Sequence, residues 1–145
     1  MLNQDFKEFV RLLGENDVRY LVVGGYAVAI HGYPRYTKDL DIWVEAEPEN
    51  ATSIVDALDA FGFGSLGLQA EDFLELDTII QLGFPPNRID LITSLPGIEF
   101  DPCYASRLEI EIDDIKVNFI DLENLKRNKR ASGRAQDIAD LENLE

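Results

Sequence analysis

The sequence is poor in the residues that build disulfide frameworks and zinc sites. It contains one cysteine, Cys103, and one histidine, His31, which excludes an internal disulfide and a cysteine-rich zinc site. It also lacks a long apolar run. The longest, over residues 21–30, is interrupted by Gly24 and Gly25 and is too short to cross a bilayer. The first residues show no basic run followed by an apolar segment, so we expect no signal peptide and a cytoplasmic protein without membrane contact.

Basic residues are scarce as well. The sequence contains 13 Lys and Arg and 28 Asp and Glu, which gives a formal net charge of −15. This charge repels a phosphate backbone and argues against broad binding of duplex DNA. Five of the thirteen nevertheless fall within nine positions: Lys126, Arg127, Lys129, Arg130 and Arg134. A charge run is usually a solvated helix face, and a local anion site is the alternative here.

The remaining composition is that of a globular protein. At 145 residues and 46% hydrophobic residues, the chain predicts one domain over 1–145 with a substantial core. Apolar spacing predicts helices over 3–15 and 26–31, one beginning at Pro48, and a helical tail from Leu122 that breaks near Ser132-Gly133. The expected strands are 19–23, 39–45, 78–82, 88–92 and a hairpin of 108–112 with 115–120. This order predicts an α/β (α+β) fold with a single mixed β-sheet flanked by helices.

Two carboxylates two residues apart, Asp39 and Asp41, lie on one of the predicted strands. Residues at this spacing point to the same face of a strand, while Leu40 points to the other. Carboxylates held this close raise each other's pKa unless a positive charge lies between them. A divalent cation such as Mg²⁺ or Mn²⁺ would supply that charge. An Asp-x-Asp alone, in an acidic protein, is more often solvent-facing.

Two further features have the same ambiguity when each is taken alone. Gly24 and Gly25 follow a predicted buried strand and precede a helix, a place where backbone amides can approach a phosphate, although such a pair is often only a turn. Asp90 lies between aliphatic residues on a later strand. It could be a metal ligand, or it could simply pair with Arg88 or cap an edge.

Together these features resemble the DNA polymerase β nucleotidyltransferase superfamily. Its signature is an aliphatic residue with Gly-Gly or Gly-Ser, a gap of about nine to thirteen residues, and Asp-x-Asp/Glu. Here thirteen residues separate Gly25 from Asp39. The chain is most similar to the small bacterial and archaeal AbiEii-like and MNT-like groups, in three blocks: Gly24-Gly25-Tyr26-Ala27-Val28 through Asp41, Gly83-x-Pro85-Pro86-x-Arg88-Ile89-Asp90-Leu91, and Lys129-x-Ala131-Ser132-Gly133-Arg134-x-x-Asp137.

The resemblance implies a metal-dependent transferase that moves a nucleoside monophosphate from an NTP, ATP among the candidates, to a hydroxyl on a protein, an RNA or a small molecule. The implied metal ligands and catalytic residues are Asp39, Asp41 and Asp90. The implied phosphate contacts are Gly24, Gly25, Arg35, Thr37, Lys129 and Arg134, so the helices from about residue 122 would complete the phosphate site. Asp137 is expected to pair with Arg134, three residues earlier.

The resemblance also bears on partners. Many relatives carry Gly-Ser where this chain has Gly24-Gly25, so one hydroxyl contact to phosphate is missing. The short chain predicts that a partner protein or a second copy closes the acceptor site, and the closest groups suggest one half of a toxin–antitoxin pair. Two other hypotheses stay open: a non-catalytic binding module or antitoxin-like subunit with this fold, and an acidic interaction protein.

Three conspicuous residues are assigned no chemistry. His31 is expected to end a helix, with a base or phosphate contact as the alternative. Cys103 is expected to be a small core residue, since no basic residue lies near it in sequence. Trp43 is expected to pack under the site, although a Trp on this face could also stack on a base.

Overall fold

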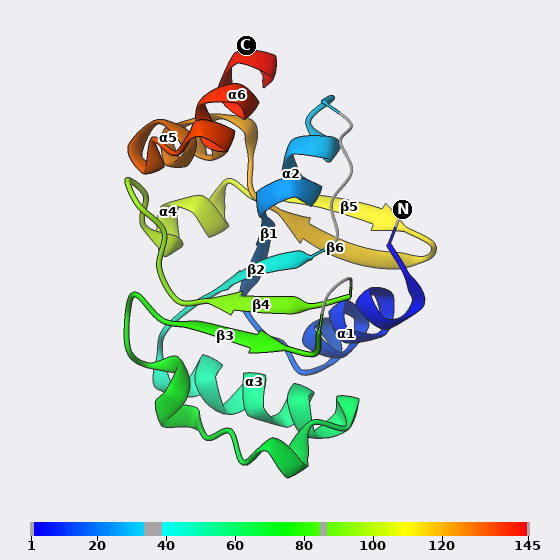
Figure 1. Ribbon diagram of the computed structural model, residues 1–145. Helices are drawn as coiled ribbons and strands as arrows, with labels where there is room; N and C mark the ends of the chain where they lie inside the picture. The colour runs from blue at the N-terminus through cyan, green and yellow to red at the C-terminus, as the bar shows by residue number, and fades with distance from the viewer. Residues whose placement is uncertain (1, 34–38, 85–86, 145) are drawn as a thin grey trace.

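A computed structural model describes residues 2–33, 39–84 and 87–144 and contains one six-stranded mixed sheet (Figure 1). The strand order across the sheet is β3-β4-β2-β1-β6-β5. The strands are β1 (Tyr20–Val23), β2 (Leu40–Val44), β3 (Ile79–Leu82), β4 (Ile89–Ile92), β5 (Leu108–Ile112) and β6 (Ile115–Phe119). The predicted single mixed sheet is confirmed.

The pairing directions explain why the sheet is mixed. β2 runs antiparallel to β1 and parallel to β4, and β1 runs parallel to β6. β3 and β5, at the two edges, are antiparallel to their neighbours. The turn between β5 and β6 holds Asp113 and Asp114 at φ 50° and 67°. Two successive left-handed residues match the twist of a tight hairpin, which confirms the predicted hairpin.

Helices cover the sheet on both sides. In Figure 1, α3 lies below the sheet, α1 lies on the right beside the ends of β3 and β4, and α2, α5 and α6 lie above the sheet. α1 packs against α3 and β6. The helices are α1 (Gln4–Glu15), α2 (Gly24–Ile30), α3 (Pro48–Phe61), α4 (Phe100–Ala105), α5 (Leu122–Ser132) and α6 (Ala135–Leu144). No helix in the described part of the chain is long and apolar enough to cross a membrane.

Local sequence accounts for the helix boundaries. The side chain of Asn3 accepts a hydrogen bond of 2.8 Å from the Phe6 amide and so caps α1. Pro48 begins α3, and Gly62, at φ 103°, ends it in the left-handed conformation. The apolar stripe of α1 is fully buried against the sheet and α3: Phe6, Phe9, Val10 and Leu13.

Three short elements have no counterpart in the sequence-based expectations. They are α4 and the two 3₁₀ turns η1 (Gly64–Leu66) and η2 (Ala70–Phe73). One turn of helix is too short to show a hydrophobic period, and α4 contains Pro102, which usually signals a break.

Candidate active site

Four charged residues lie together on one face of the sheet: Asp39, Asp41, Arg88 and Asp90. We call this cluster of three acids and one arginine the acidic square. The parallel register sets Asp41 beside Asp90, and the Leu40 amide donates to the Arg88 carbonyl at 3.0 Å one step earlier. Asp39 directly precedes β2 and Arg88 directly precedes β4, so each lies two residues before an aspartate of its strand, Asp41 or Asp90. Residues two apart in extended backbone share a face, which brings the four side chains together. The predicted convergence of three carboxylates in one place is therefore present in the fold, with one guanidinium among them.

Arg88 bridges two of these carboxylates. Its Nε donates to Asp90 Oδ1 at 2.8 Å, and its Nη2 donates to Asp90 Oδ2 at 3.1 Å and to Asp39 Oδ2 at 3.0 Å. The hydrogen bond to Asp90 raises the pKa of Arg88 above its ordinary value. The alternative in which Asp90 pairs with Arg88 is thus confirmed, and Asp39 shares the same guanidinium.

Asp41 has a different environment. Burial, followed by the negative charges of Asp90 and Asp39, raises the pKa of Asp41 to about 7, and the charge of Lys129 opposes this shift. A carboxyl that titrates near neutrality inside a cleft is a common mark of a functional site. Asp41 is therefore a candidate functional carboxyl of this cavity.

The glycine turn is fitted against Asp41. Val23 pairs with Asp41 in the sheet, and Gly24 follows at φ 66° as the first residue of α2. A Cβ on Gly24 would lie 2.2 Å from Asp41 Oδ2, closer than real Cβ contacts. Glycine is thus required both by the backbone conformation and by the approach of the carboxylate.

A cavity of about 600 Å³ opens over the acidic square. Asp39, Asp41, Arg88 and Asp90 line it together with the turn from α5 to α6. That turn contributes three lining residues: Ala131, Ser132 and Arg134. The remaining lining residues are polar or apolar: Asp77, Thr78, Ser94, Ile79, Ile92, Leu95 and Pro96. The cavity is therefore lined by both charged and apolar side chains.

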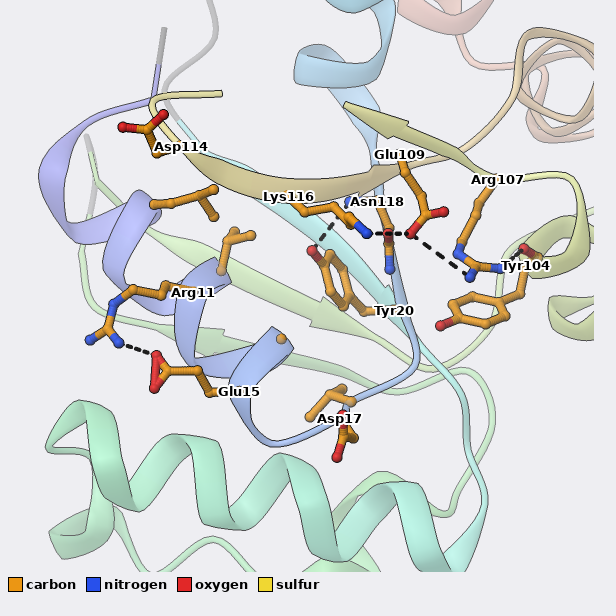
Figure 2. Close-up of a pocket in the computed structure, with 14 residues that line it drawn as sticks. Arg11, Glu15, Asp17, Tyr20, Tyr104, Arg107, Glu109, Asp114, Lys116 and Asn118 are labelled. Carbon is orange, nitrogen blue, oxygen red and sulfur yellow. Dashed lines mark hydrogen bonds and ion pairs between the residues drawn. The ribbon is translucent and has the colours of Figure 1, made fainter. Parts of the chain in front are cut away.

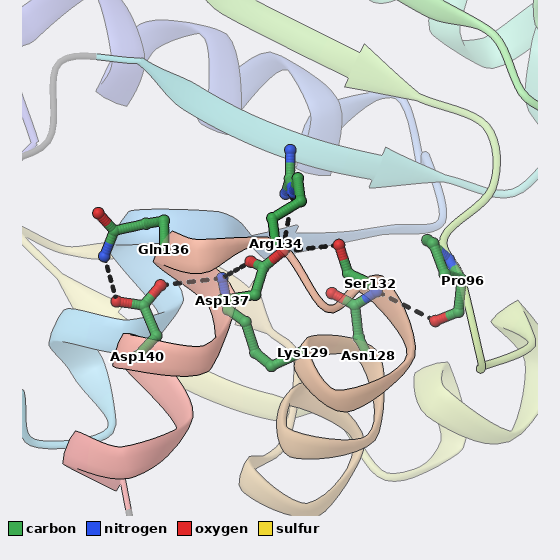
Figure 3. A network of polar contacts seen from close by, with 8 residues as sticks. All are labelled: Pro96, Asn128, Lys129, Ser132, Arg134, Gln136, Asp137 and Asp140. Carbon is green, nitrogen blue, oxygen red and sulfur yellow. Dashed lines mark hydrogen bonds and ion pairs between the residues drawn. The ribbon is translucent and has the colours of Figure 1, made fainter.

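Lys129 is placed behind this cavity rather than at its surface. Its ammonium lies 3.0 Å from Asp137 Oδ1 and 3.1 Å from Asp140 Oδ2, and the residue is 5% exposed (Figure 3). Arg134 donates to Asp137 at 2.8 Å, which confirms the expected pair. Ser132 donates to the same carboxylate at 2.6 Å. Direct contact between Lys129 and phosphate stays a prediction, and it would require these buried pairs to open.

Arg134 is the exposed member of this network. Its side chain is 78% exposed in the pair with Asp137 and points from the α5–α6 turn toward the sheet (Figure 3). Arg134 also interacts electrostatically with Asp41. A phosphate contact from Arg134 thus fits its place at the cavity, whereas Arg35 and Thr37 lie outside the described residues.

The other conspicuous residues have structural partners. His31 ends α2 and bonds through Nε2 to the Ile120 carbonyl at 2.8 Å. Trp43 is buried and packs edge-to-face on Phe100, with 5.2 Å between the two ring centroids. Burial raises the pKa of the Cys103 thiol to about 11, which makes it a poor nucleophile.

The donor chemistry of the site fits a hard divalent cation. Three carboxylates offer oxygen ligands of the kind that Mg²⁺ and Mn²⁺ prefer, and the close fit of Gly24 holds Asp41 in place. Within the described ranges, however, no three acidic, His or Cys side chains form a ready-made metal cage. The Arg88 guanidinium stands between Asp39 and Asp90, where shared ligands would have to meet.

A second cavity, of about 530 Å³, lies between α1, the start of β1 and the β5–β6 hairpin (Figure 2). Its charged groups are largely satisfied within the chain. Glu109 lies 3.7 Å from Lys116 and 4.0 Å from Arg107, and Tyr20 accepts from the Asn118 amide at 3.2 Å. None of the sequence-predicted site residues lines it, so the cavity above Asp39 and Asp41 is the candidate active site.

Comparisons with known proteins agree with this geometry. A Thermotoga maritima protein classed as a nucleotidyltransferase is 15% identical, with a TM-score of 0.64 over 95% of this chain and 88% of that one. An antigenic nucleotidyltransferase-like protein from Paracoccidioides brasiliensis is 17% identical, with a TM-score of 0.55 over 99% of this chain and 77% of that one. At these identities the likeness concerns the fold. No curated protein matches the chain.

The family described as "Nucleotidyltransferase of unknown function (DUF6036)" matches residues 1–145. The fold of the neighbours and the acidic square on β2 and β4 are consistent with that match. The chain therefore belongs to this nucleotidyltransferase family.

Proposed function

We propose that the protein transfers a nucleoside monophosphate from an NTP to a hydroxyl group, releasing pyrophosphate. The observation that carries the proposal is the register of β2 and β4, which gathers Asp39, Asp41 and Asp90 beneath one cavity. Transfer of this kind needs an attacking hydroxyl held in line with the α-phosphate and stabilisation of the negative charge that develops. No covalent protein intermediate is required.

The chain's own residues divide these tasks. Asp90 orients the attacking hydroxyl and helps to take its proton, a role that its place in the cavity lining beside Asp41 supports. The amides of Gly24 and Gly25, at the start of α2, face the phosphates, since the absence of side chains lets the backbone come close. Arg134 offsets phosphate charge from the α5–α6 turn. The apolar residues that line the cavity, Ile79, Ile92, Leu95 and Pro96, help to exclude water from the reacting groups.

Asp39, Asp41 and Asp90 would hold one or two divalent cations, Mg²⁺ or Mn²⁺. When bound, these supply charge stabilisation to the attacking and leaving oxygens. The raised pKa of Asp41 supports this role, because a carboxyl of this kind gains most when a cation joins it.

The acceptor is a hydroxyl on a protein, an RNA or a small molecule. A toxin–antitoxin role, and a second copy or partner protein that completes the acceptor site, stay predictions that rest on the resemblance.

One observation favours a second candidate, a non-catalytic binding module with the same fold. Arg88 already neutralises part of the acidic square, as a permanent ion pair would in a protein without a metal. The two candidates differ in whether the carboxylates support turnover.

Labelled transfer separates them. The protein is incubated with each α-³²P-labelled NTP, Mg²⁺ and a cell extract as acceptor source, and the label on protein and RNA is counted. The matched variants are Asp41→Asn in the site and Asp56→Asn, exposed on α3. Transfer by wild type and Asp56→Asn, and none by Asp41→Asn, supports the enzyme. Equal labelling by Asp41→Asn removes that carboxylate from the mechanism.

A further inference from the structure

We infer that Arg88 is a built-in counterion that occupies the acidic square in the metal-free protein and competes with the divalent cation for Asp39 and Asp90. The inference rests on the proposed function, because it concerns how the same site is loaded. It assigns to Arg88 a counterion role that the sequence motifs do not specify.

The hydrogen bonds show why competition is expected. Arg88 reaches both oxygens of Asp90 and one oxygen of Asp39, at 2.8, 3.1 and 3.0 Å. A cation that takes ligands from both carboxylates needs the same oxygen lone pairs. The guanidinium fork is planar, so it cannot keep all three bonds while a compact ion sits between the two acids.

Charge on the square points the same way. Asp39, Asp41 and Asp90 line the cavity with a single guanidinium, that of Arg88, among them, which leaves an excess of negative charge that attracts a cation. Arg88 directly precedes β4, and its carbonyl accepts from the Leu40 amide of β2 at 3.0 Å. Its backbone is thus fixed, whereas its side chain, 24% exposed, lines the cavity and has room to leave the acids.

The opposite role makes the opposite prediction. If Arg88 only held Asp39 and Asp90 in a shape that suits the ion, its removal would scatter the ligands and weaken metal binding. If Arg88 competes, its removal deletes the three bonds that the ion must displace. The sign of the change in metal affinity therefore decides between a competitor and a support.

The test is the binding of Mn²⁺ alone, followed by the loss of the free-ion signal in electron paramagnetic resonance. The protein is wild type, Arg88→Met, Arg88→Lys or Arg11→Met, a control on the exposed face of α1. We expect Arg88→Met to bind Mn²⁺ about tenfold more tightly than wild type, since about 1.4 kcal/mol of charge-assisted bonding no longer opposes the ion. Arg88→Lys, which keeps the charge without the fork, should fall between the two. Arg11→Met should match wild type.

A second readout guards against misfolding. In EDTA, Arg88→Met should melt at a lower temperature than wild type, and saturating Mn²⁺ should raise its melting temperature by more than that of wild type. Circular dichroism checks that each variant is folded. If Arg88→Met does not fold, Arg88→Lys alone gives the sign.

The outcomes keep the two proposals apart. Tighter binding by the Arg88 variants supports the inference. Equal or weaker binding by folded Arg88 variants, with measurable binding by wild type, overturns the inference and leaves the proposed function standing. Absence of Mn²⁺ binding by every variant overturns both.

Discussion

The Gly24 backbone lies so close to the Asp41 carboxylate that there is no room for a Cβ atom on residue 24. An added Cβ would lie 2.2 Å from Asp41 Oδ2 and 3.0 Å from its Cγ. The glycine of the predicted phosphate turn and the second aspartate of the predicted acidic pair, seventeen positions apart, therefore form one contact. This contact ties the β1–α2 turn to the acidic square.

Gly24→Ala should destabilise the fold by about 1–3 kcal/mol, because alanine at φ 66° is strained and its methyl group displaces Asp41. Urea denaturation measures the change. The matched control is Gly14→Ala in α1, where an added Cβ meets nothing within 4 Å. It should be about 0.5–1 kcal/mol more stable than wild type. Equal stability of the two variants would argue against the close fit.

The Asp41 carboxyl should make stability fall as pH rises. The pKa of Asp41 is about 7 in the folded protein and 3.8 in its ordinary state. The folded state thus holds the proton more tightly, so this contribution is complete below pH 4 and is lost as pH rises through about 7. The free energy of unfolding of wild type and Asp41→Asn, measured in EDTA at several values of pH, isolates the contribution of Asp41.

The slope of the difference between the two proteins should approach about 1.4 kcal/mol per pH unit between these limits. Asp41→Asn removes the titrating group and leaves the other acids in place. Parallel curves for the two proteins over this range would show that folding does not raise the pKa of Asp41.

Lys129→Met should cost about 3 kcal/mol of stability, since it leaves Asp137 and Asp140 buried with one positive charge fewer. Lys126→Met, on the same helix, is the control and should change stability by less than about 0.5 kcal/mol. Thermal and urea unfolding give both values. A mild effect at Lys129, with a large loss of nucleotide binding, would instead place this lysine on phosphate.

The Asp137 carboxyl should make the α5–α6 junction sensitive to acid. Hydrogen bonds from Arg134, Ser132 and Lys129 outweigh burial and hold the pKa of Asp137 well below its ordinary value of 3.8. Its contribution is present above pH 4 and is lost as pH falls below that value, the opposite sense to Asp41. Asp137→Asn should lose stability at pH 6 and much less at pH 2. Hydrogen exchange of the α6 amides locates the effect.

Much of this architecture could be predicted from the sequence because its signals are local. The alternation around Asp39 and Asp41 predicts their shared face, and the apolar stripe of residues 3–15 predicts α1. The register that sets Asp41 beside Asp90 joins segments 49 residues apart, and only the resemblance pointed to it. The six residues of α4 are too few to show a hydrophobic period, so the sequence pattern does not predict this helix.

The structure of the basic cluster could not be predicted from local sequence. Residues 126–134 carry five positive charges, which favours either solvent or an anion. Burial of Lys129 depends on Asp137 and Asp140 folding back from α6, a tertiary event that the run itself does not encode. The bridge from Arg88 to Asp39 depends in the same way on the pairing of β2 with β4.

Thermal denaturation with each NTP, with and without Mg²⁺, tests the central claim most directly. Wild-type protein should gain several degrees only when nucleotide and metal are both present, because both bind the folded acidic site. Asp41→Asn should lose that gain, and Asp56→Asn should keep it. No shift with any of the four NTPs at millimolar concentration, or an equal shift in Asp41→Asn, would contradict a triphosphate site built on Asp39, Asp41 and Asp90.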